Sequence, residues 1–219
     1  MTSEFEDRKD AGRRLATRLK EFRGDDVVVL GLPRGGVPVA AEVAAALGAP
    51  LDVILVRKLG VPFEPEVAMG AIGEGGARVL DHELITALGI TPAQIEAVAR
   101  KEQHTLAARA AALRPYSDRV KLAGRTAIIV DDGIATGATA SVACRVARAN
   151  GAARVLVAAP VGGVDAVRRV QGADDVICLL QPHAFRAVGE HYRRFGQTSD
   201  AEVVELLVEA RERLVGANE

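Results

Sequence analysis

Short apolar runs alternate with longer stretches of helical periodicity along most of the chain. Continuous apolar strands of this kind are covered on both faces, as in a parallel sheet. Five runs have strand length and are rich in β-branched residues: 27–32, 51–57, 126–132, 154–160 and 175–180. Helical patterns lie between them at 37–47, 138–149 and 164–170. The alternation predicts an α/β fold, an open, mainly parallel five-stranded sheet with helices on both faces.

Three further helices are predicted outside this core, at 4–22, 91–113 and 199–214. The second has Thr91 as N-cap, Pro92 in the first turn and Gln94 three residues on, which predicts a capping box. Ser199 and Glu202 have the same relation at the third. The segment between residues 59 and 89 is rich in Gly, Pro and Glu, and we interpret it as a long loop with a weak hairpin.

Composition removes several classes of function. The formal net charge of -1 gives no bulk electrostatic reason to bind nucleic acid, although basic helix faces occur near residues 13–20 and 100–114. No apolar run approaches the roughly 18–20 residues that cross a bilayer, and the first residues do not resemble a secretory signal. The two cysteines, Cys144 and Cys178, lie in apolar segments. We therefore expect a cytoplasmic protein without a disulfide framework or a membrane partner.

The most informative stretch is "TAIIVDDGIATGAT" at residues 126–139. It places Asp131 and Asp132 where ligands bind in open α/β sheets, beyond the carboxyl end of a strand. The small residues that follow lead into a helix N-terminus, which favours an anion such as phosphate. Carboxylates beside a phosphate site are best explained if they accept hydrogen bonds from neutral hydroxyl groups. A sugar phosphate supplies both groups.

Two more loops carry cations. "GLPRGGVPVA" follows the first predicted strand and presents Pro33, Arg34, Gly35 and Gly36 before a helix, so it is a second candidate anion site. "LVRKLGVP" ends the second predicted strand and presents Arg57 and Lys58. An ordinary turn and a solvated strand exit are the alternative interpretations of these two loops.

The stretch "VDDGIATGAT" resembles the phosphoribosyl pyrophosphate signature of type I phosphoribosyltransferases. The resemblance implies that Asp131 and Asp132 bind the ribose hydroxyls. The residues that it assigns to the donor's 5-phosphate are Gly133, Ala135, Thr136, Gly137, Ala138 and Thr139. Those that it assigns to pyrophosphate are Pro33, Arg34, Gly35, Gly36, Arg57 and Lys58, with a non-proline cis peptide bond between Pro33 and Arg34. The Arg57–Lys58 pair is similar to one in adenine phosphoribosyltransferases, where a mobile loop follows and closes over the substrate.

The resemblance also implies an activity. Ribose 5-phosphate would pass from phosphoribosyl pyrophosphate to a nitrogenous acceptor, such as a nucleobase or related heterocycle, and pyrophosphate would leave. Asp131, Asp132, Arg57 and Lys58 would be the catalytic residues. Mg²⁺ would be the cofactor, held mainly by the donor, so that no side chain is assigned as a firm metal ligand. Family analogy implies a homodimer.

The acceptor would bind in a variable lobe, the hood, outside the conserved core. Three of the seven aromatic residues fall in "FRAVGEHYRRF" after the fifth strand, and we take Phe185 and His183 as candidate acceptor-binding residues. Alternatively, these rings only anchor the C-terminal helix. The expected organisation is a single domain with a core at about 24–182 and a mobile loop at about 59–76. The N-terminal helix and the segment 183–214 would pack as hood or flanks.

The whole chain most resembles poorly characterised bacterial phosphoribosyltransferase-like proteins. The similar segments are "FEDRKDAGRRLA", "LPRGGVPVA", "VRKLGVPFEPEVAMGAIGEGG", "VDDGIATGAT" and "YRRFGQTSDAEV". The main alternative function is a non-catalytic regulator that senses phosphoribosyl pyrophosphate or a nucleotide. A hydrolase would need a water-activating base, and the sequence identifies none. Glu64, Glu66 and Glu74 lie in the predicted loop as candidates to assist Mg²⁺ or a proton transfer.

Overall fold

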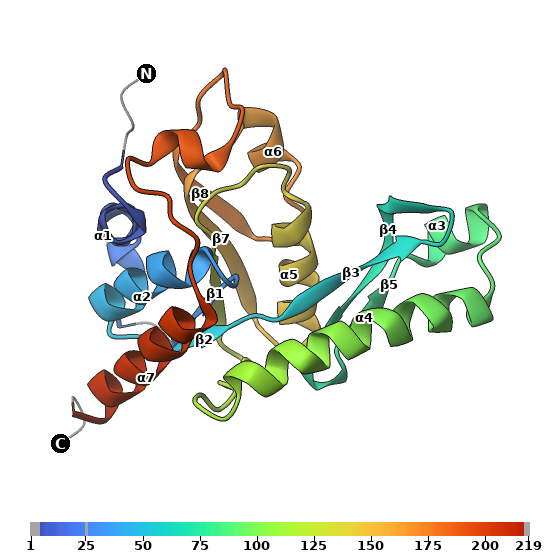
Figure 1. The fold of residues 1–219 in the computed structure, drawn as a ribbon, viewed down its shortest axis with the longest axis horizontal. Coiled ribbons are helices and arrows are strands. Elements are labelled where there is room, and N and C mark those ends of the chain that lie inside the picture. Colours follow the sequence, from blue (N-terminus) through green and yellow to red (C-terminus); the bar gives the residue numbers. More distant parts are fainter. Residues whose placement is uncertain (1–4, 25, 217–219) are drawn as a thin grey trace.

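The computed structural model of the protein describes residues 5–24 and 26–216, and a five-stranded parallel sheet forms its centre (Figure 1). The strand order is β2-β1-β6-β7-β8, and every neighbouring pair is parallel. The strands are β1 (Val27–Gly31), β2 (Leu51–Val53), β6 (Thr126–Val130), β7 (Arg154–Val161) and β8 (Asp175–Leu180). The predicted α/β class and the five predicted strand positions are confirmed, although β2 is shorter than expected.

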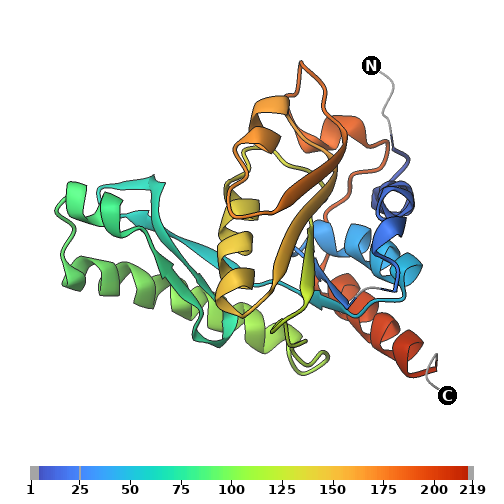
Figure 2. The ribbon, with the colours of Figure 1, turned by 180° about the vertical axis from the view of Figure 1, so that it is seen from behind.

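Successive residues of a strand point to opposite faces of the sheet, so the continuous apolar strands make both faces apolar. Helices cover both of these faces. Val27 and Val29 belong to the core formed with the first two helices, whereas Val28 and Leu30 pack on the side of the α5 helix. Figure 2 shows α5 (yellow) on one side of the sheet and α1 and α2 (blue) on the other. The helices concerned are α1 (Arg8–Arg18), α2 (Gly36–Leu47), α5 (Ala138–Ala149) and α6 (Val164–Arg168). None of the helices in the described part of the chain is long and apolar enough to span a bilayer.

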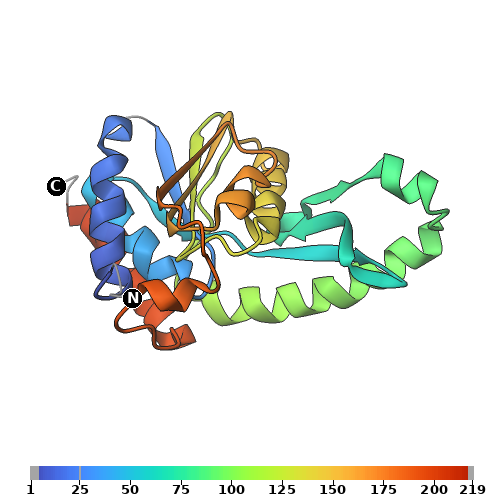
Figure 3. The same cartoon turned by 90° about the horizontal axis from the view of Figure 1, so that it is seen from above.

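A second, antiparallel sheet extends away from the core, in a region where only a long loop with a weak hairpin was predicted (Figure 3). It consists of β3 (Val56–Val61), β4 (Glu64–Gly73) and β5 (Arg78–Leu80), followed by α3 (His82–Ala87) and α4 (Pro92–Leu113). We call this whole unit, residues 56–113, the arm. The segment 59–76 is therefore largely a hairpin with a short 3-10 turn (Glu74–Gly76), and the prediction of a long loop was wrong in this respect.

The predicted bounds 51–57 of the second strand were wrong, because that range joins parts of two sheets. Val53 pairs with Gly31, the last residue of β1, so the parallel sheet offers no partner beyond this point. After Ile54 N donates to Gly31 O, the chain turns, and Val56 pairs with Gly73 of β4. Arg57 and Lys58 consequently lie inside an antiparallel strand, not at the carboxyl end of a parallel one.

Hydrogen bonds at the N-caps mark where the flanking helices begin. Asp7 accepts a hydrogen bond from Asp10 N, so α1 begins at Arg8 and not at Glu4, which lies outside the described residues; a 3-10 turn (Lys20–Phe22) follows. The capping box of α4 is confirmed by Thr91 N donating to Gln94 Oε1 at 2.8 Å and Gln94 N donating to Thr91 Oγ1 at 3.3 Å. Before the last helix, α7 (Asp200–Gly216), Glu202 N donates to Ser199 Oγ. Another 3-10 turn (Val188–His191) follows β8.

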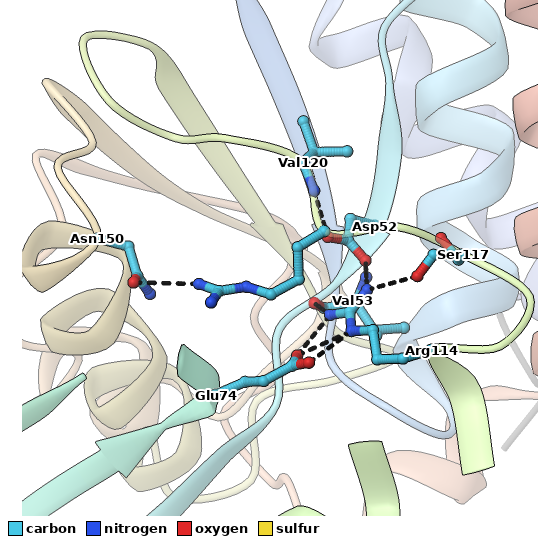
Figure 4. A network of polar contacts seen from close by, with 8 residues as sticks. Asp52, Val53, Glu74, Arg114, Ser117, Val120 and Asn150 are labelled. Carbon is cyan, nitrogen blue, oxygen red and sulfur yellow. Dashed lines mark hydrogen bonds and ion pairs between the residues drawn. The ribbon is translucent and has the colours of Figure 1, made fainter. Parts of the chain in front are cut away.

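A buried polar network joins the arm to the core (Figure 4). The Arg114 guanidinium, just after α4, donates to Asp52 of β2 at 2.7 Å and to both carboxylate oxygens of Glu74 at 2.6–2.9 Å. Val120 N donates to the second oxygen of Asp52. Burial raises the pKa of Asp52, while Arg114 opposes this increase. Arg114, which follows the last helix of the arm, thus links β2 of the core sheet to Glu74, which follows β4.

Candidate functional site

The candidate site lies where the loops after β1 and β6 meet. These strands are neighbours, and the chain leaves β1 toward β2 on one side and β6 toward β7 on the other. Their carboxyl ends therefore form a switch point, the usual ligand position in open α/β sheets. The loop after β1 carries Pro33–Gly36, and the loop after β6 carries the acidic pair. The structure thus brings together two of the three motifs at one edge of the sheet.

The acidic pair packs directly against the glycines of the other loop. A Cβ atom at Gly35 would overlap the carboxylate of Asp132, and one at Gly36 would lie 2.9 Å from the Asp131 Cα. Asp131 Oδ1 accepts a hydrogen bond from Asp132 N at 2.9 Å. The glycines are needed for close approach, since any side chain would separate the pair from the Pro33–Arg34 loop.

The loop after the acidic pair has the geometry of an anion cradle. Gly137 has a φ of 81°, which favours glycine, and it places Ala138 at the N-terminus of α5. Ala135, Thr136, Ala138 and Thr139 are exposed, so their backbone and hydroxyl groups can reach a ligand. Gly133 is buried against Val188 and has no room for a side chain. The helix dipole adds to the attraction for an anion at this point.

The peptide bond between Pro33 and Arg34 is cis, as the resemblance implied. Arg34 is half-buried, and both residues line a cleft of about 740 Å³. Arg57 and Thr139 line the same cleft, so cations from two sheets face one space beside the α5 N-terminus. Two cations that face one space favour the binding of a ligand with several negative charges.

Arg57 and Lys58 also line a neighbouring cleft of about 650 Å³ between the arm and the residues Thr136, Ala138 and Thr139. Both cations have carboxylate partners here. Arg57 Nε donates to Glu102 Oε2 of α4 at 2.8 Å, and Lys58 Nζ lies 3.3 Å from Glu66 Oε2. A phosphate ligand would compete with these carboxylates for the two cations.

The loop glutamates have distinct surroundings. Glu74 is bound by Arg114 in the junction network and Glu66 pairs with Lys58, while Glu64 is exposed. Only Glu66 is among the residues that line the cleft of Arg57 and Lys58. Assistance to Mg²⁺ or to a proton transfer remains a prediction for all three.

The electrostatics of the acidic pair are asymmetric. Burial, and then the nearby charge of Asp132, raise the pKa of Asp131 from 3.8 to about 8. Two carboxylates this close share a site in which one favours the protonated form near neutral pH. Asp131 is therefore a group whose charge responds to any ligand that brings a cation or a hydroxyl group.

Sequence reasoning missed Arg8 and Tyr192 at this site. Arg8 Nε donates to Asp132 Oδ2 at 2.8 Å, and the Tyr192 hydroxyl donates to Asp132 O at 2.6 Å. Burial raises the pKa of Tyr192, so its hydroxyl stays a donor. The segments "FEDRKDAGRRLA" and "YRRFGQTSDAEV" carry these residues, but nothing in either segment indicates that it reaches the acidic pair.

The candidate acceptor residues lie in a separate cavity of about 480 Å³ on the other side of the Ala135 loop. His183 and Phe185 line it, together with Ala135, Arg168 and Arg169. The Phe185 ring stacks on the His191 imidazole, with 5.7 Å between centroids and 4° between planes. Tyr192 instead packs against both Phe5 and Phe195. The aromatic cluster is thus divided between a cavity wall and an anchor for the N-terminal segment.

Within residues 5–24 and 26–216, no group of three or more His, Cys, Asp or Glu side chains is arranged to hold a metal ion. Asp131 and Asp132 supply carboxylate oxygens of the kind that Mg²⁺ prefers, but they are only two residues. A Mg²⁺ bound together with a phosphate compound would therefore take most of its ligands from that compound.

Comparisons with known proteins agree with this geometry. The family model described as "Phosphoribosyl transferase domain" matches residues 1–192. Two Mycobacterium tuberculosis proteins that carry the name "Putative phosphoribosyl transferase" are 58% identical over 204 residues, which is 93% of this chain and 46% of each relative. The chain therefore spans about half the length of the curated relatives it matches. The crystal structure of TT1426 from Thermus thermophilus is 42% identical, with a TM-score of 0.89, and the match covers 94% of this chain and 98% of that one. The chain belongs to the phosphoribosyl transferase domain family.

Proposed function

We propose that the protein transfers ribose 5-phosphate from phosphoribosyl pyrophosphate to a nitrogenous acceptor and releases pyrophosphate. The observation that carries this proposal is the contact between the acidic pair, whose loop leads into α5, and the Gly35–Gly36 loop, which leads into α2. Carboxylates, a phosphate cradle and a cationic loop adjoin one another there, and the donor presents hydroxyl groups, a 5-phosphate and a pyrophosphate.

Each part of the site has a role in the displacement at ribose C1. Asp131 and Asp132 accept hydrogen bonds from the ribose hydroxyls, and Thr136–Thr139 hold the 5-phosphate. Departure of pyrophosphate builds positive charge on the sugar and negative charge on the leaving group. Arg34, Arg57 and Lys58 stabilise that negative charge, and one such preorganised group is typically worth about 3–4 kcal/mol in the transition state. Mg²⁺, when bound with the donor, neutralises phosphate charge.

The acceptor in this proposal is a nucleobase or related heterocycle that stacks on Phe185. A base stacked on an aromatic ring gains about 1–3 kcal/mol. The cavity beside Ala135 supports this assignment, because it places Phe185 and His183 next to the loop that holds the donor. The acceptor, the Mg²⁺ dependence, closure of the arm over the donor and a homodimeric assembly all belong to the proposal.

Calorimetric titration of phosphoribosyl pyrophosphate with Mg²⁺ tests the donor site. We expect binding by the wild type and loss of binding by the Asp131→Asn/Asp132→Asn variant. Asp118→Asn is the matched control, because the Asp118 side chain is 90% exposed and lies outside the site. No binding by a folded wild type would contradict the proposal.

An acceptor screen for pyrophosphate release separates the enzyme from the regulator. Release with one class of heterocycle, reduced by Phe185→Ala, supports the transferase. Tight donor binding without release for any acceptor would favour a sensor of phosphoribosyl pyrophosphate.

A further inference from the structure

Two segments outside the parallel sheet meet beside the acidic pair. Phe5 N donates to His191 O and Arg193 N donates to Phe5 O, both at 2.9 Å, so the start of the described chain pairs with the segment after β8 (Figure 1). We call residues 5–8 and 192–196 together the clasp. The Phe5 and Tyr192 rings lie 5.4 Å apart within it. Neither segment is part of the parallel sheet, and each contacts Asp132, one through Arg8 and the other through Tyr192.

Arg8 is the centre of the clasp. Its Nε donates to Asp132 Oδ2 at 2.8 Å, its Nη1 donates to Gly196 O at 2.7 Å, and its guanidinium lies 3.9 Å from the centroid of the Phe195 ring. The Arg8 and Asp132 side chains are only 12% and 15% exposed. An ion pair this well shielded is little screened by solvent, in contrast to an ordinary surface pair.

Each carboxylate of the acidic pair accepts a hydrogen bond from another part of the chain through one of its oxygens. Asp131 Oδ1 accepts from Asp132 N, and Asp132 Oδ2 accepts from Arg8. Asp131 Oδ1 is thus occupied by the backbone and Asp132 Oδ2 by Arg8, and the Asp131 and Asp132 side chains also interact with each other. Arg8 is therefore a contact from outside the pair that orients the Asp132 carboxylate.

We propose that Arg8 is a positioning residue of the donor site, which fixes the Asp132 carboxylate so that one oxygen faces a ribose hydroxyl. This inference rests on the proposed function. The arginine fork suits the role, since it directs separate donors to Asp132 and to Gly196 while its flat face packs on Phe195. A lysine can keep the charge but not both hydrogen bonds and the stacking.

The alternative is that Arg8 only attaches the N-terminal segment to the molecule. Arg194 provides the matched control, because it also belongs to the clasp and pairs with Asp7 at 2.8 Å, yet its side chain is 68% exposed and does not contact Asp132. Loss of Arg194 removes a clasp contact and leaves the acidic pair unchanged. The two arginines therefore separate attachment from positioning.

The experiment measures calorimetric affinity for phosphoribosyl pyrophosphate and for inorganic pyrophosphate, each with Mg²⁺, in the wild type, Arg8→Gln, Arg8→Lys and Arg194→Gln. For Arg8→Gln we expect the affinity for phosphoribosyl pyrophosphate to fall at least about tenfold, the size of one lost charge-assisted hydrogen bond. Pyrophosphate affinity should stay within about twofold, since that ligand has no hydroxyl for Asp132. Arg8→Lys should recover part of the loss, and Arg194→Gln should behave as the wild type.

Each contrary result has a distinct meaning. Unchanged donor affinity in Arg8→Gln overturns the positioning role and leaves the proposed function intact. Two results would show that Arg8 only attaches the N-terminal segment. One is that Arg8→Gln loses as much affinity for pyrophosphate as for phosphoribosyl pyrophosphate. The other is that Arg194→Gln loses as much affinity for phosphoribosyl pyrophosphate as Arg8→Gln does. If Arg8→Gln does not fold, Arg8→Lys decides by the same comparison of the two ligands. Failure of the wild type to bind phosphoribosyl pyrophosphate overturns the proposed function and this inference together.

Discussion

At the residue scale, Asp131 is the group whose chemistry depends most on its surroundings. It follows a strand that is buried along most of its length, contacts Asp132 and lies against the backbone of Gly36. The sequence allowed the pair to be recognised, because two carboxylates after a buried strand need partners. It did not allow the partners to be named, since Arg8 lies more than a hundred residues away along the chain.

The raised pKa of Asp131 makes stability depend on pH. The folded pKa of about 8 exceeds the ordinary value of 3.8, so between these values the folded protein keeps a proton that the unfolded chain has lost. The contribution to stability is complete below pH 3.8 and is lost as pH rises through about 8. Asp131→Asn cannot ionise and still has an oxygen to accept from Asp132 N. We therefore expect the free energy of unfolding of this variant to rise relative to the wild type as pH increases across that window.

Urea denaturation of the ligand-free protein at several pH values checks this prediction. Asp118→Asn is again the control, because its exposed carboxylate should give a curve parallel to that of the wild type. Parallel curves for Asp131→Asn and the wild type would show that the pKa is not raised.

At the scale of elements, the sequence predicted what local pattern determines and missed what depends on distant partners. The bounds of α5 and β8 were predicted correctly, because periodicity and flanking glycines or polar residues mark them. The end of β2 could not be predicted, since it depends on where β1 ends. The arm was hidden for the same reason: β3 is only half-buried and gains its partner from β4. The sequence identified Arg57 and Lys58 as a cationic motif, but it did not indicate that they lie on the arm.

This placement gives α4 an influence on the cations of the cleft. Glu102 of α4 pairs with Arg57, whose side chain is 46% exposed, and its carboxylate would compete with a pyrophosphate for the guanidinium. Glu102→Gln should therefore tighten binding of inorganic pyrophosphate with Mg²⁺. The gain should be modest, about two- to fivefold, because exposed ion pairs are worth only about 0.2–1 kcal/mol. Calorimetry or competition with phosphoribosyl pyrophosphate measures it.

Glu96→Gln is the matched control for this effect. Glu96 also lies on α4 and pairs with an arginine, Arg78, but it does not line either cleft beside Arg57. Equal effects of the two variants would mean that net charge, and not release of Arg57, changes the affinity.

At the scale of the whole molecule, the candidate site lies between a core and two additions that reach it from different directions. The clasp contacts Asp132 through Arg8, and the arm contributes Arg57 and Lys58 to the cleft. The Arg114 network is one of the contacts that join the arm to the core, since it links Asp52 of β2 to Glu74, which follows β4. The separation of the two walls of the cleft therefore depends in part on a few buried charges.

Removal of Arg114 should destabilise the protein strongly. The Asp52 side chain is only 4% exposed, and Arg114→Met would leave its buried charge without a cation, a change that typically costs about 3–5 kcal/mol. The additional substitutions Asp52→Asn and Glu74→Gln remove the stranded charges, so the triple variant should recover a large part of that loss. Urea denaturation at neutral pH gives the free energies of unfolding. Arg78→Met, which breaks a partly exposed ion pair on the arm surface, should cost only about 0–1 kcal/mol. A cost for Arg114→Met as small as this control would mean that the network does not hold the arm to the core.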